Sequence, residues 1–223
     1  MLRVGLTGGL GSGKTTAGLW FAEFGAHVIS ADEVGRALMQ PGERVYAEIV
    51  AKFGPGVVKP DGSLDRWALA RIAFGEGRIE ELNAIVHPAT IARQEEMIAE
   101  IAAREPDAVV VVESALVFET KHGATGEGTE GPWRRRFDKI VLVRASEEKR
   151  IARFVERARA SGSPQKWSAL DAEARRRMAQ QIDDEWKAAH SDFVLTNDGS
   201  VEELRAQVDQ LWPTLKEAAE EHK

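Results

Sequence analysis

The sequence predicts an α/β fold, in which a five-stranded parallel sheet is covered by helices and carries a helical insertion. Three observations predict it. Short apolar runs alternate with longer segments of helical periodicity. A glycine-rich turn directly follows the first apolar run. The connection between the second and third runs, residues 32 to 107, is almost wholly helical in pattern.

The five predicted strands are short apolar runs bounded by turn residues. The first ends in glycines, and the third contains four consecutive valines, which is typical of a strand buried on both faces. Because the runs alternate with helices, we expect parallel pairing through right-handed crossovers. The runs cover residues 2–8, 26–30, 108–114, 137–145 and 191–197.

The remaining segments have helical periodicity, and Gly25 after the first of them is a typical helix C-terminal residue. The predicted helices cover residues 14–25, 31–40, 43–54, 64–74, 78–105, 146–160, 171–189 and 200–223. They divide the chain into a core, a helical substrate region, a helical lid and a C-terminal helical tail. The core comprises residues 1–32, 107–145 and 190–211, the substrate region 33–106, the lid about 150–182, and the tail 212–223. The glycine-rich stretch 120–133 reads as an exposed loop.

Composition excludes several classes of function. The chain has 223 residues and no cysteine, so disulfides, thiolate metal sites and cysteine nucleophiles are excluded. The start has no basic segment followed by an apolar one, and no apolar run reaches the roughly 18 residues needed to span a bilayer. The net charge of -6 disfavours nucleic acid as a partner. We therefore expect a cytoplasmic protein with neither a membrane nor a nucleic-acid partner.

The stretch "GLTGGLGSGKTT" explains the early glycines. Gly8, Gly13, Lys14 and Thr15 fit G-x-x-x-x-G-K-[ST], the phosphate-binding P-loop, with a predicted strand before and a helix after. Glycines let backbone N–H groups turn toward phosphate oxygens, and the helix N-terminus adds positive potential. Lys14 would reach the β and γ phosphates, and the Thr15 hydroxyl would bind Mg²⁺. The predicted ATP-binding residues of this loop are Gly9, Leu10, Gly11, Ser12, Gly13, Lys14, Thr15 and Thr16.

The loop alone does not identify the acceptor of the phosphoryl group. A GTPase normally carries N-K-x-D, and "TNDG" at residues 196–199 is not that motif. A nucleic-acid motor usually needs a longer chain and a clear hydrolytic glutamate. A small-molecule kinase therefore fits best, and the more distant alternative is a non-catalytic ATP-binding regulator.

Two carboxylates follow predicted strands, at the sheet edge where open α/β folds bind ligands. Asp32 is our candidate for the residue that orients an acceptor hydroxyl and takes its proton. Its alternative role is the N-cap of the next helix, and the two roles can coexist. Glu113 could support Mg²⁺ or pair with an arginine.

Eight stretches together resemble the dephospho-CoA kinase family, in the family's order and over residues 2 to 211. The most specific are D-G-x-L-D-R, L-N-x-I-x-H-P and x-L-x-F-E; the stretches read "GLTGGLGSGKTT", "VISADEVGRAL", "PGERVYAEIVAKFG", "DGSLDRWALARIAF", "LNAIVHPATI", "ESALVFE", "RRMAQQ" and "TNDGSVEELRAQVDQL". The resemblance implies a three-layer P-loop kinase fold and ATP-dependent phosphorylation of the ribose 3′-hydroxyl of dephospho-CoA, the last step of coenzyme A synthesis. It implies Mg²⁺ as cofactor, and ATP and dephospho-CoA as partners. Another P-loop small-molecule or nucleotide kinase is the nearer alternative.

The resemblance also implies roles for single residues. Asp32 matches the family's catalytic base, and Arg36 matches the arginine of D-x-x-x-R-x-L. Lys14 and Arg153 are the other predicted catalytic residues. Arg157, Asn197 and Gly199 complete the predicted ATP site, and Arg177 and Gln181 match R-x-x-x-Q after the lid. The predicted substrate-binding residues are Asp32, Arg36, Arg66, His87 and Glu113.

Some alternatives and departures accompany these roles. Arg153 and Arg157 lie on one helix face, which suits a transferring phosphoryl group but is also ordinary for a surface helix. His87 could contact the acceptor or cap a helix break before Pro88. The family often has aspartate where this chain has Ser30, and proline where it has Ala115, which affects acceptor-side contacts.

Overall fold

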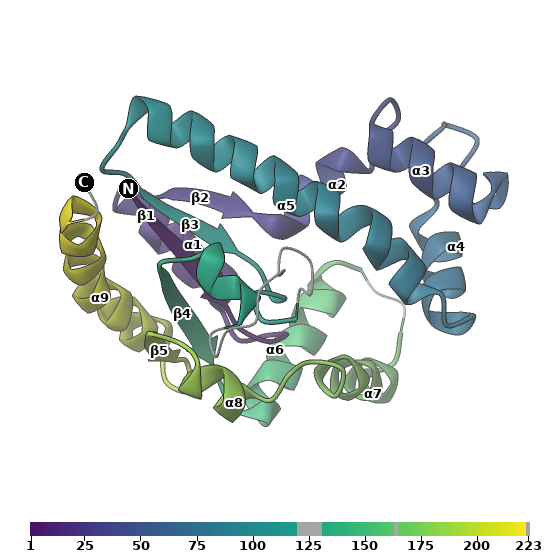
Figure 1. Ribbon diagram of the computed structural model, residues 1–223. Coiled ribbons are helices and arrows are strands. Elements are labelled where there is room, and N and C mark those ends of the chain that lie inside the picture. Colours follow the sequence, from purple (N-terminus) through teal and green to yellow (C-terminus); the bar gives the residue numbers. More distant parts are fainter. Residues whose placement is uncertain (120–130, 163–164, 222–223) are drawn as a thin grey trace. The chain divides into compact units, whose positions relative to one another are not determined.

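The computed structural model describes residues 1–119, 131–162 and 165–221. Its strands form one five-stranded parallel sheet in the order β2-β3-β1-β4-β5, which confirms the predicted fold class (Figure 1). Each strand falls inside one of the predicted apolar runs. The strands are β1 Leu2–Thr7, β2 His27–Ser30, β3 Val109–Glu113, β4 Lys139–Arg144 and β5 Phe193–Thr196.

The chain divides into two compact units, Met1–Val28 with Ile101–Lys223, and Ile29–Glu100. The α-helices are α1 Lys14–Glu23, α2 Ala31–Leu38, α3 Arg44–Phe53, α4 Arg66–Ala70, α5 Ile79–Arg104, α6 Glu147–Ala160, α7 Trp167–Met178, α8 Asp184–Ala189 and α9 Val201–Glu221. A π-helical turn, Arg71–Gly75, continues α4, and short 3-10 turns cover Pro55–Val57 and Pro132–Arg135. Residues 120–130 of the predicted glycine-rich loop lie outside the described residues.

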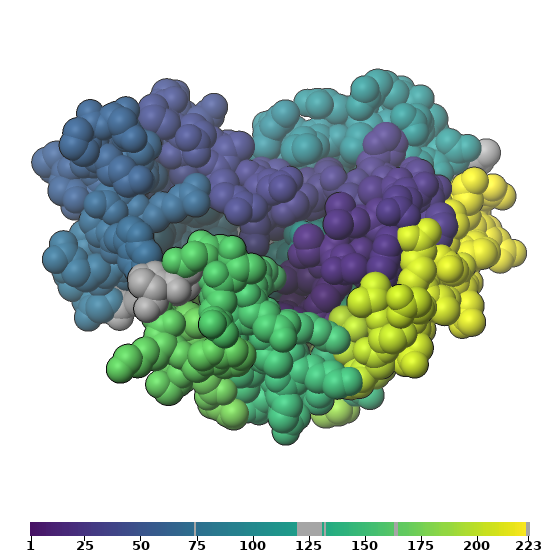
Figure 2. Space-filling view, turned by 180° about the vertical axis from the view of Figure 1, so that it is seen from behind, coloured from purple at the N-terminus to yellow at the C-terminus, as the bar shows by residue number. Residues whose placement is uncertain are grey.

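The core of the first unit lies between the sheet and two helices, α1 and α9. These helices pack on one sheet face, and Figure 2 shows α9 in yellow against the purple N-terminal residues. Alternate residues of each strand face this core, as the period of two in a strand requires. Helix α9 continues through Pro213, and Leu215 and Ala219 beyond it are buried. The core includes Leu2, Val4, Leu6, Phe21, Val109, Val111, Val141, Val143, Leu204 and Val208.

The second unit has its own apolar core, built from α3, α4 and the segments around them. Tyr46 fastens this core to a turn by donating a hydrogen bond from its hydroxyl to the Gly62 main-chain oxygen, at 2.7 Å. The core residues are Val45, Ile49, Val57, Leu64 and Leu69.

One predicted helix was wrong. The segment 171–189 is not continuous: α7 begins earlier, at Trp167, and ends at Met178, and α8 begins at Asp184. The cause is Asp183, whose carboxylate accepts hydrogen bonds from Glu185 N and Trp186 N and so caps α8. An aspartate that caps a new helix cannot also continue the old one. The break places residues 179–183 in an irregular segment, the α7–α8 linker.

No helix in the described part of the chain has both the length and the apolar character needed to span a bilayer.

Candidate functional site

The loop Gly8–Thr16 covers the turn from β1 and the first residues of α1, and its backbone shape depends on glycine. Gly11 and Gly13 have φ of 72° and 99°, in the region that L-residues with side chains rarely adopt. A Cβ on Gly13 would also lie 2.2 Å from Asn197 Nδ2. The loop can therefore run close to the residues behind it while α1 begins at Lys14, with its free N–H groups at the loop.

Three predicted residues meet at the start of α1. Thr15 Oγ1 donates a hydrogen bond to Glu113 Oε1 at 2.9 Å, and Lys14 Nζ lies 3.8 Å from the same oxygen. Glu113 is buried at the end of β3, and its register partner is Leu6 of β1. This places the carboxylate beside the loop, where it pairs with Lys14 rather than with an arginine.

A second group ties the loop to α6 and to the end of β5. Arg153 donates from Nη2 to the Asn197 main-chain oxygen at 2.9 Å, and from Nη1 to Gly11 O at 3.5 Å. Asn197 is buried and donates from Nδ2 to Ser12 O at 2.8 Å. Arg153 and Asn197 are thus held against the loop, whereas Arg157 and Gly199 are exposed at the surface.

Asp198, the residue after Asn197, connects the segment that follows β5 to the start of α6. Asp198 Oδ1 accepts a hydrogen bond from Ser146 N at 2.7 Å, and Lys149 donates to the Asp198 main-chain oxygen. The hydrogen bond from Ser146, with the nearby charges of Lys149 and Arg153, lowers the pKa of Asp198 below its ordinary value. The segment that follows β5 is therefore fastened to the start of α6.

Asp32 and Arg36 lie together on α2 in the second unit. The N-cap of α2 is Ser30, whose Oγ accepts from Glu33 N at 3.4 Å, so the alternative N-cap role for Asp32 is wrong. The Asp32 side chain is in the first turn and exposed. Arg36 Nε donates to the Asp32 main-chain oxygen at 3.1 Å, which leaves the Asp32 carboxylate outside this contact.

Two further acceptor-side candidates lie on other helices of the second unit. Arg66 is the exposed first residue of α4, which Asp65 caps by accepting from Trp67 N and Ala68 N. His87 is half-buried within α5, and that helix continues through Pro88. The predicted alternative of a helix break capped by His87 is therefore wrong.

Comparison with known proteins decides the family. The family model described as dephospho-CoA kinase matches residues 2–203. The chain belongs to the dephospho-CoA kinase family. A curated dephospho-CoA kinase of Corynebacterium jeikeium is 40% identical over 96% of this chain and 100% of its own length, and one of Symbiobacterium thermophilum is 39% identical over 94% and 79%. A crystal structure from Thermus thermophilus is 27% identical, with a TM-score of 0.70 over 96% of this chain and 97% of that one.

Two oxygen groups of this dephospho-CoA kinase family member suit a magnesium ion. The Thr15 hydroxyl and the Glu113 carboxylate lie within 2.9 Å of each other, and Mg²⁺ prefers oxygen ligands. The described residues contain no cluster of three or more His, Cys, Asp or Glu that could hold a metal by itself. Thr15 and Glu113 thus supply two oxygen groups, and Mg²⁺ usually takes its other ligands from phosphate and water.

Sequence reasoning missed Arg150, which contacts the predicted ATP loop, Gly8–Thr16, and Asp184, which pairs with Arg150. Arg150 Nε donates to Leu10 O at 3.0 Å, and its Nη1 lies 2.6 Å from Asp184 Oδ2. Gln181, which the resemblance brought in without a structural role, accepts from Leu10 N at 3.3 Å. One signal was available: Arg150 lies beside Ile151 and one turn before Phe154, on the buried face of α6.

Proposed function

We propose that the protein transfers the γ-phosphoryl group of ATP to the ribose 3′-hydroxyl of dephospho-CoA and so forms coenzyme A. The observation that carries the proposal is the dephospho-CoA kinase model's match over residues 2–203, a range that contains the whole ATP loop and every acceptor-side candidate. A non-catalytic ATP-binding regulator, the more distant alternative, would lack an acceptor-side base. The exposed carboxylate of Asp32 on α2 argues against this alternative.

On the ATP side, the chain supplies fixed positive groups. The loop and the N-terminus of α1 hold the phosphates through backbone N–H groups. Lys14 has a single carboxylate oxygen at 3.8 Å, a separation that allows its ammonium to turn toward phosphate. Arg153, held against the loop by Gly11 and Asn197, adds a second cation, and the exposed Arg157 follows one turn later on α6. Together they stabilise the negative charge of the transferring group.

Thr15 and Glu113 would hold Mg²⁺ on the loop side. The ion neutralises phosphate charge when bound.

On the acceptor side, Asp32 orients the ribose hydroxyl and accepts its proton. The hydroxyl oxygen then forms a bond to the γ-phosphorus, and the bond from that phosphorus to the bridging oxygen of ADP breaks. Arg36, Arg66 and His87 are proposed contacts for the anionic and polar groups of dephospho-CoA. The proposed small-molecule partners are ATP and dephospho-CoA, and the proposed location is the cytoplasm.

An acceptor screen tests the reaction. Purified protein with Mg²⁺ and ATP should form ADP with dephospho-CoA and not with nucleoside monophosphates. The product should carry its new phosphate on the 3′-oxygen by ³¹P NMR. Turnover of a nucleoside monophosphate in place of dephospho-CoA would transfer the proposal to the alternative P-loop kinase class.

Asp32→Asn tests the proposed base, with Glu33→Gln as its matched control. Both residues are exposed carboxylates in the first turn of α2, so each change removes the same charge near the same helix end. D32N should lower kcat by about 10²-fold or more while ATP binding is unchanged, and E33Q should leave kcat unchanged. Equal rates for D32N and the unmodified enzyme would refute the role of Asp32.

A further inference from the structure

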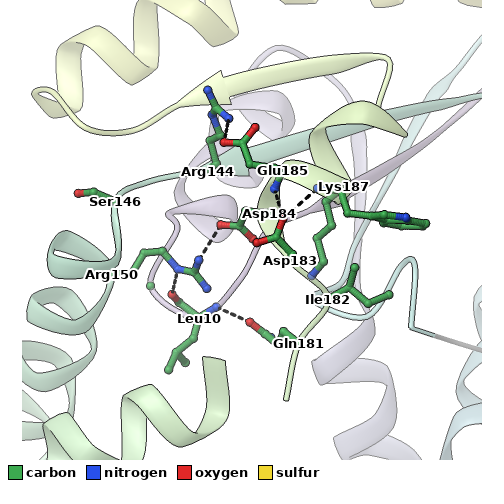
Figure 3. Close-up of polar contacts among 12 residues, drawn as sticks. Leu10, Arg144, Ser146, Arg150, Gln181, Ile182, Asp183, Asp184, Glu185 and Lys187 are labelled. Atoms are coloured by element: carbon green, nitrogen blue, oxygen red, sulfur yellow. Dashed lines mark hydrogen bonds and ion pairs between the residues drawn. The ribbon is translucent and has the colours of Figure 1, made fainter. Parts of the chain in front are cut away.

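Arg150 is a buried arginine that directly contacts the ATP loop. Only 7% of the residue is exposed, although arginine is rarely buried without a purpose. It projects from α6 to Leu10 O and to Asp184, the first residue of α8 (Figure 3). A buried ion pair offers little net stability, because desolvation offsets the attraction. The pair is therefore better explained by the geometry that it imposes.

Arg150 and Gln181 constrain two peptide groups of the loop. Arg150 Nε holds the Leu10 carbonyl at 3.0 Å, and Gln181 Oε1 holds the Leu10 N–H at 3.3 Å. Figure 3 shows Leu10 between these two side chains. A trans peptide is planar, so a carbonyl pulled to one side turns the next N–H, that of Gly11, to the opposite side. The Arg150 contact thus sets the direction of the Gly11 N–H, which is proposed to face phosphate, and the Gln181 contact fixes the preceding peptide group.

The loop is shaped to admit Arg150. A Cβ on Gly9 would lie 2.0 Å from Arg150 Nη2, and a Cβ on Gly11 would lie 2.3 Å from the Arg150 main-chain oxygen. The Leu10 side chain packs on the apolar cluster that joins α6 to α7, which includes Phe154 and Leu170. The loop, α6 and the α7–α8 linker are therefore packed together around one guanidinium.

Asp184 fixes the far end of that guanidinium. Its carboxylate receives Arg150 Nη1 at 2.6 Å, and the side chains of Arg150 and Asp184 are 8% and 21% exposed. Arg150 thus has one nitrogen on the loop and another on α8, and no other residue type presents a rigid planar fork of this kind. Lysine has the same charge but only one nitrogen, so it cannot hold both positions in the same way.

We infer that Arg150, anchored by Asp184, is a positioning residue that orients the ATP loop and couples ATP binding to the start of α8. The inference rests on the proposed function in that ATP is taken as the ligand of the loop. Arg150 does not act on the phosphoryl group itself, because its guanidinium is buried behind the loop and engaged by Leu10 and Asp184.

The test uses Arg150→Lys, Asp184→Asn and the double variant, with Arg176→Lys as control. Arg176 is an exposed arginine of α7 outside the loop contacts, so R176K makes the same chemical change where no effect is expected. For each protein, calorimetry gives the Kd for Mg-ATP without acceptor, and steady-state assays give kcat and both KM values. Thermal unfolding reports whether each variant is folded.

We expect R150K to weaken ATP binding about tenfold, the size of one lost hydrogen bond to a charged group. D184N should weaken it in the same direction, because Asp184 acts through Arg150, and the double variant should be no weaker than R150K within about twofold. The KM for dephospho-CoA and kcat at saturating ATP should stay within about twofold. A merely structural role would raise the Kd for ATP and the KM for dephospho-CoA and lower kcat together.

Several outcomes would overturn the inference. They are an unchanged ATP Kd in both single variants, additive losses in the double variant, or equal losses for ATP and dephospho-CoA. If R150K does not fold, D184N, which preserves side-chain volume, decides by the same criteria. Unmodified protein that binds no ATP overturns the proposed function as well, whereas unmodified protein that binds ATP and turns over separates the two questions.

Discussion

Gly13 and Gly25 offer a matched test of why the loop Gly8–Thr16 is rich in glycine. They flank the same helix, α1, and have nearly the same backbone angle, φ 99° and 101°. Alanine at either position must adopt a left-handed conformation, which costs about 1–2 kcal/mol. A Cβ on Gly25 would have nothing within 4 Å, so Gly25→Ala should cost about this amount and no more.

Gly13→Ala adds a second cost. Its Cβ would lie 2.2 Å from Asn197 Nδ2, and the buried Asn197 amide is held by Ser12 and Arg153, so it cannot swing into solvent. Displacing that amide breaks its hydrogen bond to Ser12 O at 2.8 Å, a buried loss of about 1–3 kcal/mol. Together with the backbone strain, G13A should cost about 2–5 kcal/mol of the free energy of unfolding.

Urea unfolding followed by circular dichroism measures both free energies, and calorimetry measures the Kd for Mg-ATP. G13A should lose at least about 1 kcal/mol more than G25A and bind ATP at least about tenfold more weakly. G25A should bind ATP like the unmodified protein, because Gly25 lies at the other end of α1. Equal losses of stability in the two variants would refute the close-contact argument and leave only backbone strain.

Two other predictions concern charges near the site. Asp198 has a lowered pKa in the fold, so its contribution to stability is fully present above the pKa of an unfolded aspartate and is lost as pH falls through the folded value. The difference in unfolding free energy between the unmodified protein and Asp198→Asn should thus be constant from pH 5 to 7 and shrink below about pH 4; a difference that persists at pH 2.5 would contradict this. Lys187 is fully buried and lies 2.7 Å from Glu119, so Lys187→Met should cost about 3–5 kcal/mol by leaving the carboxylate without its cation. The double variant with Glu119→Leu should recover at least half of that loss in urea unfolding, and no recovery would show that Lys187 acts through something other than the pair.

Much of the fold could be predicted because the strands are marked locally. The four valines of β3 are all buried, as a central parallel strand requires. The break between α7 and α8 could not be predicted from helical periodicity, since the pattern continues across it. Asp183 decides the break by capping α8, and a capping aspartate looks the same in sequence as an exposed helical one.

Some residues of the site could likewise be predicted from the local sequence, whereas others depend on residues far away in the chain. Lys14 and Thr15 follow from the glycine motif because the motif, the strand and the helix are contiguous. Arg150 does not, because its burial depends on Leu10, 140 residues away, and on Asp184, 34 residues away. A charged residue on the apolar face of α6 was the one local signal, and the partner that explains it belongs to a different element.

Glu113 shows why strand order matters more than motif at this kind of site. From sequence, a glutamate after four valines could serve a metal or pair with an arginine. The order β3-β1-β4 places β3 directly beside the strand that leads into the ATP loop, with Glu113 opposite Leu6. Had β2 and β3 exchanged places, β3 would no longer be adjacent to β1, and the same glutamate would lie one strand further from Lys14 and Thr15. The adjacency of β1 and β3, which no local pattern encodes, therefore turns a strand-end carboxylate into a partner of Lys14.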